Sequence, residues 1–292
     1  MIACSTVQKS DIRSHYNLST VFYRLLWGRH IHHGLWSDEE IASNTVVAKS
    51  TVAQQRLTET LAAEAGIRMG EKVLDVGCGM GSSSIHLASK LQCDVTGVTI
   101  SAVQRRWAQC CARWHGVSHQ TRFLCADAEQ VELSSQDFDV VWSIECTEHL
   151  FDKARFFQRA ARWLKPGGRM AICAWLAGNR LDAAAKEQVH KVCEGFFCPS
   201  LGTSEDYCRW MTDAGLNKVR CHDWTSAVDR TWEICRDRVR RSGVRWLAKW
   251  IDRNAVMFLD RFDTILQAYR TGAMQYGVFV FEKPAAGRAT GA

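Results

Sequence analysis

The sequence predicts an α/β protein built on a doubly wound parallel sheet, and two observations carry this prediction. First, short apolar runs alternate with helical patterns from residue 71 onward. Second, these runs are apolar on both faces, which is typical of central strands that helices cover on both sides. Strand–helix–strand repetition implies right-handed crossovers, and a series of them produces a doubly wound sheet.

The elements follow in a regular order. Helices are expected between the first strands, and Pro166 with the glycines of "LKPGGR" is expected to end the third helix and turn the chain into the next strand. The predicted strands are 72–77, 93–98, 121–126, 138–144 and 168–175, and the predicted helices are 81–91, 101–115 and 152–164.

Further elements lie on either side of this series. Residues 203–224 add a helix and a strand, with Thr203 or Ser204 as the N-cap and Gly215 as the stop, and 275–284 read as a final strand. The segments 38–65 and 228–270 have helical patterns, and the first opens with the capping box Ser37-Asp-Glu-Glu40.

Composition limits the function classes. The chain has 292 residues, 47% apolar and 23% charged, with a net charge of +6, which is too weak and dispersed to indicate nucleic acid. Of its 13 cysteines several lie in apolar runs and none forms a C-x-x-C pair, so we expect reduced, buried thiols and no metal site. No apolar run is long enough to span a bilayer and no signal peptide is recognisable. We therefore expect a cytoplasmic protein.

The stretch "VLDVGCGMGSSS" (73–84) carries the most chemical information. A strand runs into Gly77, Gly79 and Gly81 and then into a helix, so the backbone can turn sharply and a ligand can approach it closely. The spacing is G-x-G-x-G instead of the dinucleotide pattern G-x-G-x-x-G. Asp75, two residues before the first glycine, would repel a pyrophosphate and favour an ammonium or sulfonium ligand.

This stretch resembles motif I of the class I S-adenosylmethionine-dependent methyltransferases, and the resemblance continues along nearly the whole chain. "GVTISAVQ" (97–104) has no acid at the strand end and is similar to the "GVTLSxxQ" variant of the cyclopropane-synthase, sterol and tocopherol methyltransferase groups. By this resemblance Thr99, Ile100 and Gln104 contact the ribose and adenine of the cofactor. Ser101 is also expected to cap the following helix.

Two further motifs extend the resemblance. "CADAEQ" (125–130) is similar to the loop that contacts the adenine amino group, with Asp127 and Ala128 at the matching positions. "VVWSIECTEHL" (140–150) is similar to the motif after the fourth strand, at the sheet edge where open α/β folds bind ligands. The resemblance implies that Ile144 and Glu145 border the cofactor. It also implies that Glu148 and His149 face the acceptor.

The N-terminal segment "HYNLSTVFYRLLWGRHIHHGLW" (15–36) resembles the lid of the gamma-tocopherol methyltransferase-like branch of small-molecule enzymes. The resemblance places Tyr16 at the methionine moiety and His32, His33 and Gly34 between cofactor and acceptor. A zinc site is the alternative interpretation of these histidines. Adjacent His32 and His33 point apart in extended backbone, which leaves too few ligands together, and His30 is expected only to pack in the lid.

The same resemblance implies a Rossmann-like, seven-stranded sheet, mostly parallel with an antiparallel last strand. We expect one domain over 1–292, monomeric or homodimeric. Its parts would be an N-terminal helical lid segment (1–66), a cofactor-binding core (67–224), an inserted helical acceptor cap (225–272) and the final strand (273–284). Residues 236–253 mix basic and aromatic side chains, so a substrate cap, a solvated face and weak contact with an anionic membrane all remain open.

The expected reaction is methyl transfer from S-adenosylmethionine to a small organic acceptor, either a phenolic or quinol carbon or oxygen or an amine nitrogen. His149 and His33 are candidate bases and Glu148 is their partner or an electrostatic anchor. A lipid- or sterol-directed or cyclopropane-type enzyme is the alternative. An NAD-dependent oxidoreductase is disfavoured by the glycine spacing, and a nucleic-acid methyltransferase by "ECTEH" in place of an Asn/Asp-Pro-Pro-aromatic motif.

Overall fold

A seven-stranded sheet with strand order β4-β3-β2-β5-β6-β9-β8 forms the centre of the computed structural model, which describes residues 1–42, 50–242 and 261–285. Neighbouring strands from β4 to β6 are parallel, whereas β9 is antiparallel to both β6 and β8. The predicted fold is therefore confirmed. The strands are β2 (Lys72–Val76), β3 (Asp94–Thr99), β4 (Thr121–Cys125), β5 (Phe138–Ile144), β6 (Leu164–Ala177), β8 (Asn217–Asp223) and β9 (Met274–Glu282).

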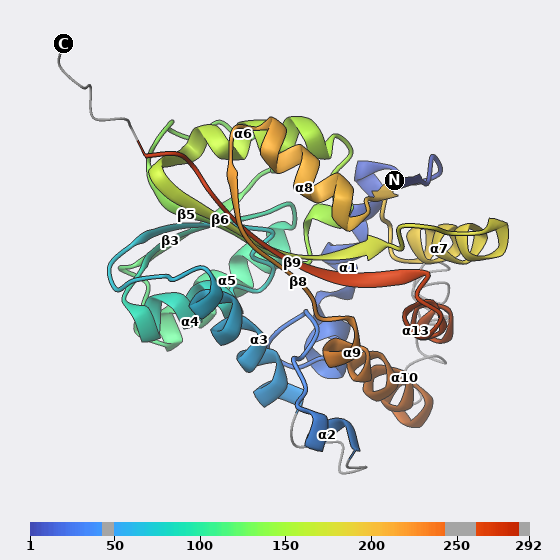
Figure 1. Ribbon diagram of the computed structural model, residues 1–292. Coiled ribbons are helices and arrows are strands. Elements are labelled where there is room, and N and C mark those ends of the chain that lie inside the picture. Colours follow the sequence, from blue (N-terminus) through green and yellow to red (C-terminus); the bar gives the residue numbers. More distant parts are fainter. Residues whose placement is uncertain (43–49, 243–260, 286–292) are drawn as a thin grey trace.

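Helices cover both faces of this sheet. Figure 1 shows α6 and α8 over one face and α3, α4 and α5 over the other, with α9, α10 and α13 grouped below the start of β9. The described helices are α1 (Lys9–Leu26), α2 (Asp38–Ala42), α3 (Ser50–Glu64), α4 (Ser82–Leu91), α5 (Ala102–Trp114), α6 (Lys153–Trp163), α7 (Ala183–Gly195), α8 (Ser204–Asp213), α9 (Thr225–Val228), α10 (Arg230–Ser242) and α13 (Phe262–Arg270).

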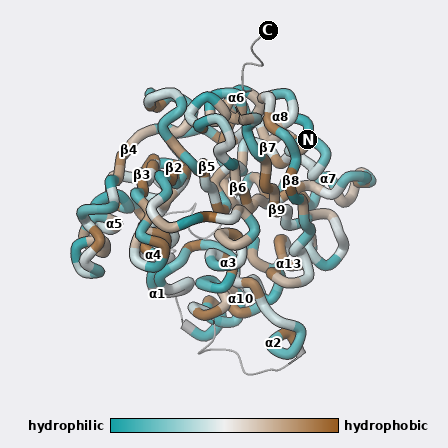
Figure 2. The backbone as a smooth tube through the Cα atoms, turned by 60° about the vertical axis from the view of Figure 1, so that its left-hand side comes forward, coloured by the Kyte–Doolittle hydropathy of each residue, from teal (hydrophilic) through white to brown (hydrophobic). Residues whose placement is uncertain are grey.

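The strands are apolar on both faces, as their sequences indicate. Along β5, Val140 and Trp142 pack into the core on one side of the sheet, while Val141 packs into the core on the other. All three side chains are fully buried. Figure 2 shows hydrophobic stretches along the central strands and hydrophilic stretches on the outer helices. Burial of this kind stabilises the fold by roughly 25 cal/mol per Å² of apolar surface.

Three predicted helix ends are confirmed. The Ser101 hydroxyl accepts from the Gln104 backbone N–H at 3.1 Å and caps α5. Thr203 and Asp206 form a reciprocal capping box at the start of α8. Gly215, with φ of +81°, follows the last turn of α8 in the left-handed region that glycine tolerates best.

At "LKPGGR" the predicted end of the helix is confirmed, but the predicted separate turn is wrong. Helix α6 ends at Trp163, and Leu164–Ala177 is one continuous strand. Its register against β5 shifts between Phe138 and Val140, so the extra residues form a bulge. Pro166 has no N–H to donate, and an irregular stretch of a strand tolerates that loss.

Some predicted helical stretches lie partly outside the described residues. Residues 38–65 include α2 and α3, and 228–270 include α10 and α13; 43–49 and 243–260 are outside the description. A small antiparallel sheet of β1 (Ile2–Ala3) and β7 (Ser200–Leu201) has no sequence signal. It ties the start of the chain to the segment that follows α7.

Gly81 provides a test of packing at the loop before α4. Its φ is +80°, and a Cβ there would lie 2.8 Å from the Ala108 Cβ and 3.1 Å from the Phe123 Cζ. We expect Gly81→Ala to lower the free energy of unfolding by about 2–5 kcal/mol, because it adds overpacking to backbone strain. Gly116→Ala is the control, since φ there is +73° with no atom within 4 Å of the added Cβ.

Urea denaturation measures both variants. The Gly116→Ala control should lose only the strain contribution, about 1 kcal/mol. Equal losses in the two variants would contradict the packing role assigned to Gly81.

Candidate active site

A cavity with about 980 Å³ of empty space lies at the carboxyl ends of β2, β3 and β5. Open α/β sheets bind ligands at this edge. Residues predicted to bind the cofactor come together here from six separate segments of the chain. Those that line this outer cavity are Tyr16, His32, Asp75, Gly77, Gly79, Thr99, Ile100, Gln104, Asp127, Ala128, Ile144 and Glu145.

The glycine loop forms the floor of the outer cavity. Gly77 has φ of +78°, and a Cβ there would lie 2.2 Å from the Cys146 Cβ, so no larger residue fits. Asp75 below it is buried and accepts a 2.5 Å hydrogen bond from the Ser84 hydroxyl. Burial raises the pKa of Asp75 to about 7. Gly81, in contrast, is not placed for the cofactor contact predicted from the sequence. It does not line the outer cavity and packs against α5 instead.

Gln104 offers an unused donor to a ligand. Its Oε1 accepts from the Thr99 hydroxyl at 3.0 Å, while its buried Nε2 has no partner among the described residues. A buried amide N–H without an acceptor is costly, so a ligand oxygen or ring nitrogen in the cavity would stabilise it. This orphan donor fits the ribose or adenine contact that the sequence predicts for Gln104.

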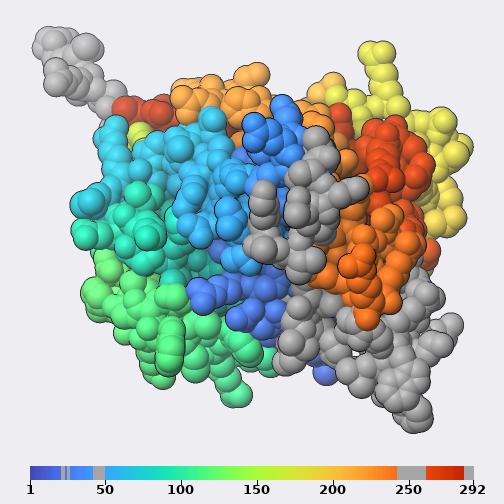
Figure 3. Space-filling model, turned by 90° about the horizontal axis from the view of Figure 1, so that it is seen from below, coloured from blue at the N-terminus to red at the C-terminus, as the bar shows by residue number. Residues whose placement is uncertain are grey.

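Lys9 is a cavity residue that sequence reasoning missed. Its Nζ lies 2.6 Å from Asp127 Oδ2 and 2.7 Å from Glu129 Oε2, so α1 is joined by ion pairs to the loop after β4. Figure 3 shows the N-terminal segment in blue between the cyan and green half of the molecule and the orange segment of α10. Residues of the N-terminal segment, among them Lys9 and Tyr16, thus line the outer cavity.

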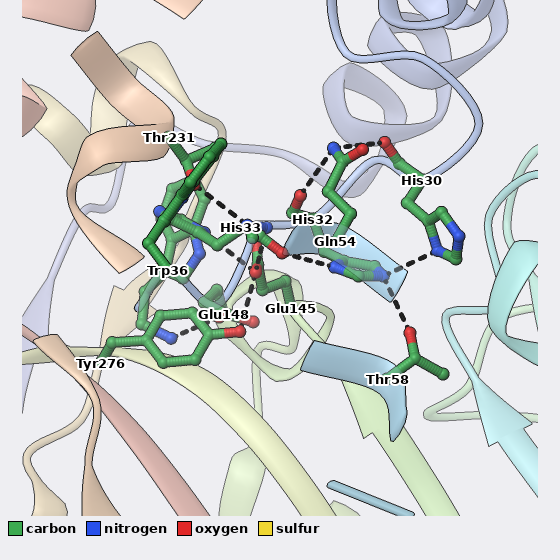
Figure 4. A network of polar contacts seen from close by, with 12 residues as sticks. His30, His32, His33, Trp36, Gln54, Thr58, Glu145, Glu148, Thr231 and Tyr276 are labelled. Carbon is green, nitrogen blue, oxygen red and sulfur yellow. Dashed lines mark hydrogen bonds and ion pairs between the residues drawn. The ribbon is translucent and has the colours of Figure 1, made fainter. Parts of the chain in front are cut away.

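The three histidines occupy different places, as Figure 4 shows. His30 Nδ1 and His32 Nε2 are 3.1 Å apart, and His32 Nδ1 donates to the His33 carbonyl at 2.8 Å. Burial lowers the pKa of His30 and of His32, so both rings stay neutral and hold the segment together. The described residues contain no group of three or more His, Cys, Asp or Glu side chains that could hold a metal.

Glu145 joins three elements at one oxygen. Its Oε1 accepts from the His33 backbone N–H at 2.8 Å and from the Tyr276 hydroxyl at 2.8 Å, and His33 Nδ1 lies 2.9 Å away (Figure 4). Burial alone would raise the pKa of Glu145, but the neighbouring His33 holds it below its ordinary value. Glu145 is therefore ionised and connects the lid, the end of β5 and β9.

A smaller inner chamber, with about 470 Å³ of empty space, adjoins the outer cavity. Tyr16, Ile31, Glu145 and His149 line both spaces. The three candidate catalytic residues, His33, Glu148 and His149, all line the inner chamber. His32 and His33 thus face different spaces, as expected for adjacent residues. Aromatic walls that the sequence analysis did not assign to the site come from Trp27, Trp175, Phe196 and Trp232.

The hydrogen bonds of His149 fix its tautomer. Nδ1 lies 3.0 Å from the Phe197 carbonyl, which only accepts, so Nδ1 carries the hydrogen. Nε2 therefore accepts from the Tyr16 hydroxyl at 2.8 Å. Burial lowers the pKa of His149 to about 4, which keeps the ring neutral. Phe197, a non-glycine residue with φ of +57°, is strained, as residues at functional sites often are.

Only one of the two carboxyl oxygens of Glu148 has a hydrogen-bond partner among the described residues. Its Oε1 accepts from the Trp175 backbone N–H at 2.5 Å, while its buried Oε2 has no partner among the described residues. Burial raises the pKa of Glu148 to about 8. The side chain is therefore a mostly neutral acid near pH 7 that faces an aromatic chamber.

Fold and site together define a class of protein. A doubly wound sheet with an acid before a G-x-G-x-G loop, an orphan donor at Gln104 and an adjoining aromatic chamber is the arrangement of an S-adenosylmethionine-dependent methyltransferase. The outer cavity fits S-adenosylmethionine, since its lining carboxylates suit a sulfonium better than a phosphate.

Comparison with known proteins agrees. Residues 74–172 match the family model described as a methyltransferase domain. The chain is 34% identical over 218 residues to 27-O-demethylrifamycin SV methyltransferase of Amycolatopsis mediterranei, covering 70% of this chain and 76% of that protein. It is 29% identical over 289 residues to the chloroplastic tocopherol O-methyltransferase of Arabidopsis thaliana, covering 94% and 82%.

The chain therefore belongs to the S-adenosylmethionine-dependent methyltransferases of small molecules, among relatives that include tocopherol O-methyltransferase. The fold is also similar to that of the [4+2]-cyclase SpnF, with a TM-score of 0.82 at 22% identity over 98% of this chain and 99% of the other. The described residues contain no helix long and apolar enough to cross a membrane.

Burial of Glu148 makes stability depend on pH. Because its folded pKa of about 8 exceeds its ordinary value of 4.5, the folded state keeps a proton that the unfolded chain loses, and stability falls as pH rises across that window. Glu148→Gln removes the titrating group and keeps an oxygen for the Trp175 N–H. We expect the Tm of the variant, relative to wild type, to rise from about pH 4.5 to about pH 8 and then to level off.

Thermal melts by circular dichroism across this range measure the effect. Glu205→Gln, at an exposed position, is the control and should give a Tm difference that does not change with pH. Asp75 titrates in both proteins and cancels in the comparison. A constant Tm difference for Glu148→Gln would contradict the raised pKa.

Proposed function

We propose that this enzyme methylates a small organic acceptor bound in the inner chamber, at a phenolic or quinol carbon or oxygen or at an amine nitrogen. The supporting observation is that the outer cavity and the inner chamber meet at Tyr16, Glu145 and His149. When bound, S-adenosylmethionine supplies an electrophilic methyl carbon. The protein then needs to align the acceptor, exclude water and accept a proton.

The cofactor contacts proposed here follow the cavity lining. Thr99, Ile100 and Gln104 would hold the ribose and adenine, and Asp127 with Ala128 the adenine amino group. Asp75 and Glu145 would face the positively charged end of the cofactor. His32 would support the lid through its own hydrogen bonds, since both of its ring nitrogens are engaged within the protein.

The proposed proton path passes through Tyr16. Tyr16 lines both spaces, and its hydroxyl donates to His149 Nε2 at 2.8 Å. Nε2 is the accepting nitrogen because the Phe197 carbonyl holds the hydrogen on Nδ1. For a hydroxyl acceptor, Tyr16 would take the acceptor's proton as it gives its own to His149. His33, paired with Glu145, would shape the chamber and position the lid.

The relatives support a proposal that covers both oxygen and nitrogen acceptors. They include enzymes named for an O-methylated tocopherol, for a rifamycin precursor and for the alkaloid norajmaline, whose methyltransferase from Rauvolfia serpentina acts on nitrogen. A lipid-directed enzyme is the runner-up. Its proposed membrane segment, 236–253, is described only up to residue 242, where Arg236 and Arg240 form ion pairs with acids. We keep a cytoplasmic location as a prediction.

The hydrogen bond between Tyr16 and His149 gives the sharpest test. We expect His149→Gln and Tyr16→Phe each to lower kcat by about 100-fold, the usual contribution of a positioned proton acceptor. Because both act on one proton, the double variant should lose little more than either single variant. Transfer of labelled methyl groups to a panel of phenols and amines measures this, with binding of S-adenosylhomocysteine as the check on folding.

Exposed His119 gives the matched control, and His119→Gln should keep wild-type turnover. Full turnover in His149→Gln would remove His149 from the mechanism. Tight binding of NADH in place of S-adenosylmethionine would overturn the proposed function as a whole.

A further inference from the structure

The aromatic walls of the inner chamber form a closed cluster of rings. Trp175 lies 5.5 Å from Trp232 and 5.4 Å from Phe196, and Phe196 lies 5.2 Å from Trp232, measured between ring centroids. Interplanar angles of 70° to 81° make all three contacts edge-to-face. The three rings therefore turn different faces and edges to their surroundings, and the negative face of an indole attracts cations.

The charged residues that line the inner chamber also favour a cationic ligand. Two carboxyl groups line it, Glu145 and Glu148, and its lining among the described residues includes no lysine or arginine. Glu145 already has a partner in His33, 2.9 Å away. Glu148 Oε2 is different, because it is buried, has no hydrogen-bond partner among the described residues and has no lysine or arginine beside it in the chamber, although Lys153 outside the chamber lowers the pKa of Glu148.

Buried Lys153 does not supply that missing charge. Its Nζ donates to the Leu150 carbonyl at 2.7 Å and to the Ser200 hydroxyl at 2.8 Å, and it is not a lining residue. An acceptor that carries a carboxylate, a diphosphate or a phenolate at its reacting end would thus meet two acids and neither a lysine nor an arginine, and the lining His33 is already paired with Glu145. A cationic acceptor would meet aromatic side chains and the unpartnered oxygen of Glu148.

We propose that, within the methyl-transfer function proposed above, the acceptor is an amine that enters as its ammonium form and is selected by Trp175, Trp232 and Glu148. Glu148 is a mostly neutral acid in the empty chamber, and it loses its proton to solvent as the ammonium binds beside Oε2, because a nearby cation favours the carboxylate. The carboxylate then accepts a proton from the ammonium, which leaves a neutral amine with its lone pair and a neutral carboxylic acid. The nitrogen bonds to the methyl carbon while the C–S electron pair stays on sulfur. The product is a methylated ammonium, and Glu148 is again the neutral acid of the empty chamber when the product leaves.

The test compares choline with its uncharged isostere 3,3-dimethylbutan-1-ol, which differs only by carbon in place of nitrogen. Binding of each is followed by tryptophan fluorescence, on full-length protein saturated with S-adenosylhomocysteine. We expect choline to bind about tenfold more tightly than the isostere, within the range known for a desolvated cation over aromatic rings. Equal binding, tighter binding of the isostere or no saturable binding of choline would overturn the inference.

Variants test whether the preference for choline over the isostere arises in the inner chamber. Trp175→Leu and Glu148→Gln should each reduce the ratio of the two affinities severalfold. Trp210→Leu is the matched control, because this equally buried tryptophan packs on the opposite side of the sheet, and it should keep the ratio. Glu148→Gln preserves side-chain volume and carries the test if Trp175→Leu fails to fold. An unchanged ratio in Glu148→Gln would contradict the role of Oε2.

Different results would contradict the methyltransferase function and the inference that the acceptor is an amine. If wild-type protein does not bind S-adenosylhomocysteine, the methyltransferase function itself fails. If it binds S-adenosylhomocysteine but does not distinguish choline from the isostere, only the amine inference fails.

Discussion

The buried carboxylate of Glu145 is the interaction on which the rest of the site depends. One oxygen accepts hydrogen bonds from the lid backbone at His33 and from Tyr276 on β9, while Glu145 itself stands at the end of β5. An isolated buried carboxylate would be strongly unfavourable, so its partners must stay in place whenever it is ionised. This requirement places the N-terminal segment over the sheet edge and separates the outer cavity from the inner chamber.

Burial then gives neighbouring acidic groups different properties. Glu145 has hydrogen-bond donors and a histidine beside it, and its pKa is lowered despite burial. Glu148, three residues further on, has one backbone donor and an open oxygen, and its pKa rises to about 8. Two carboxyls from one short motif can thus hold different protonation states, the usual way in which one site separates a fixed charge from an exchangeable proton.

Local sequence signals predicted much of the fold. The apolar runs of β2 to β5, the caps at Ser101 and Thr203 and the glycine loop depend on residues near one another in the chain, so short-range rules recovered them. The turn at Pro166 was misread because the register of β6 against β5 depends on a strand some 25 residues away. The pairing of β1 with β7 joins segments about 200 residues apart and left no local trace.

The sequence by itself determined the order of strands and helices, the sulfonium-compatible glycine loop and the residues that surround the cofactor cavity, since each is encoded in a contiguous motif. Only the tertiary structure decided how those motifs share protons and charges. The tautomer of His149 depends on the Phe197 carbonyl, the ion pairs of Lys9 reach the loop after β4, and the walls at Trp27, Trp175 and Trp232 come from three distant segments. Burial and hydrogen-bond partners are set by the whole fold, and they determine which groups of the inner chamber are charged and which can still form hydrogen bonds.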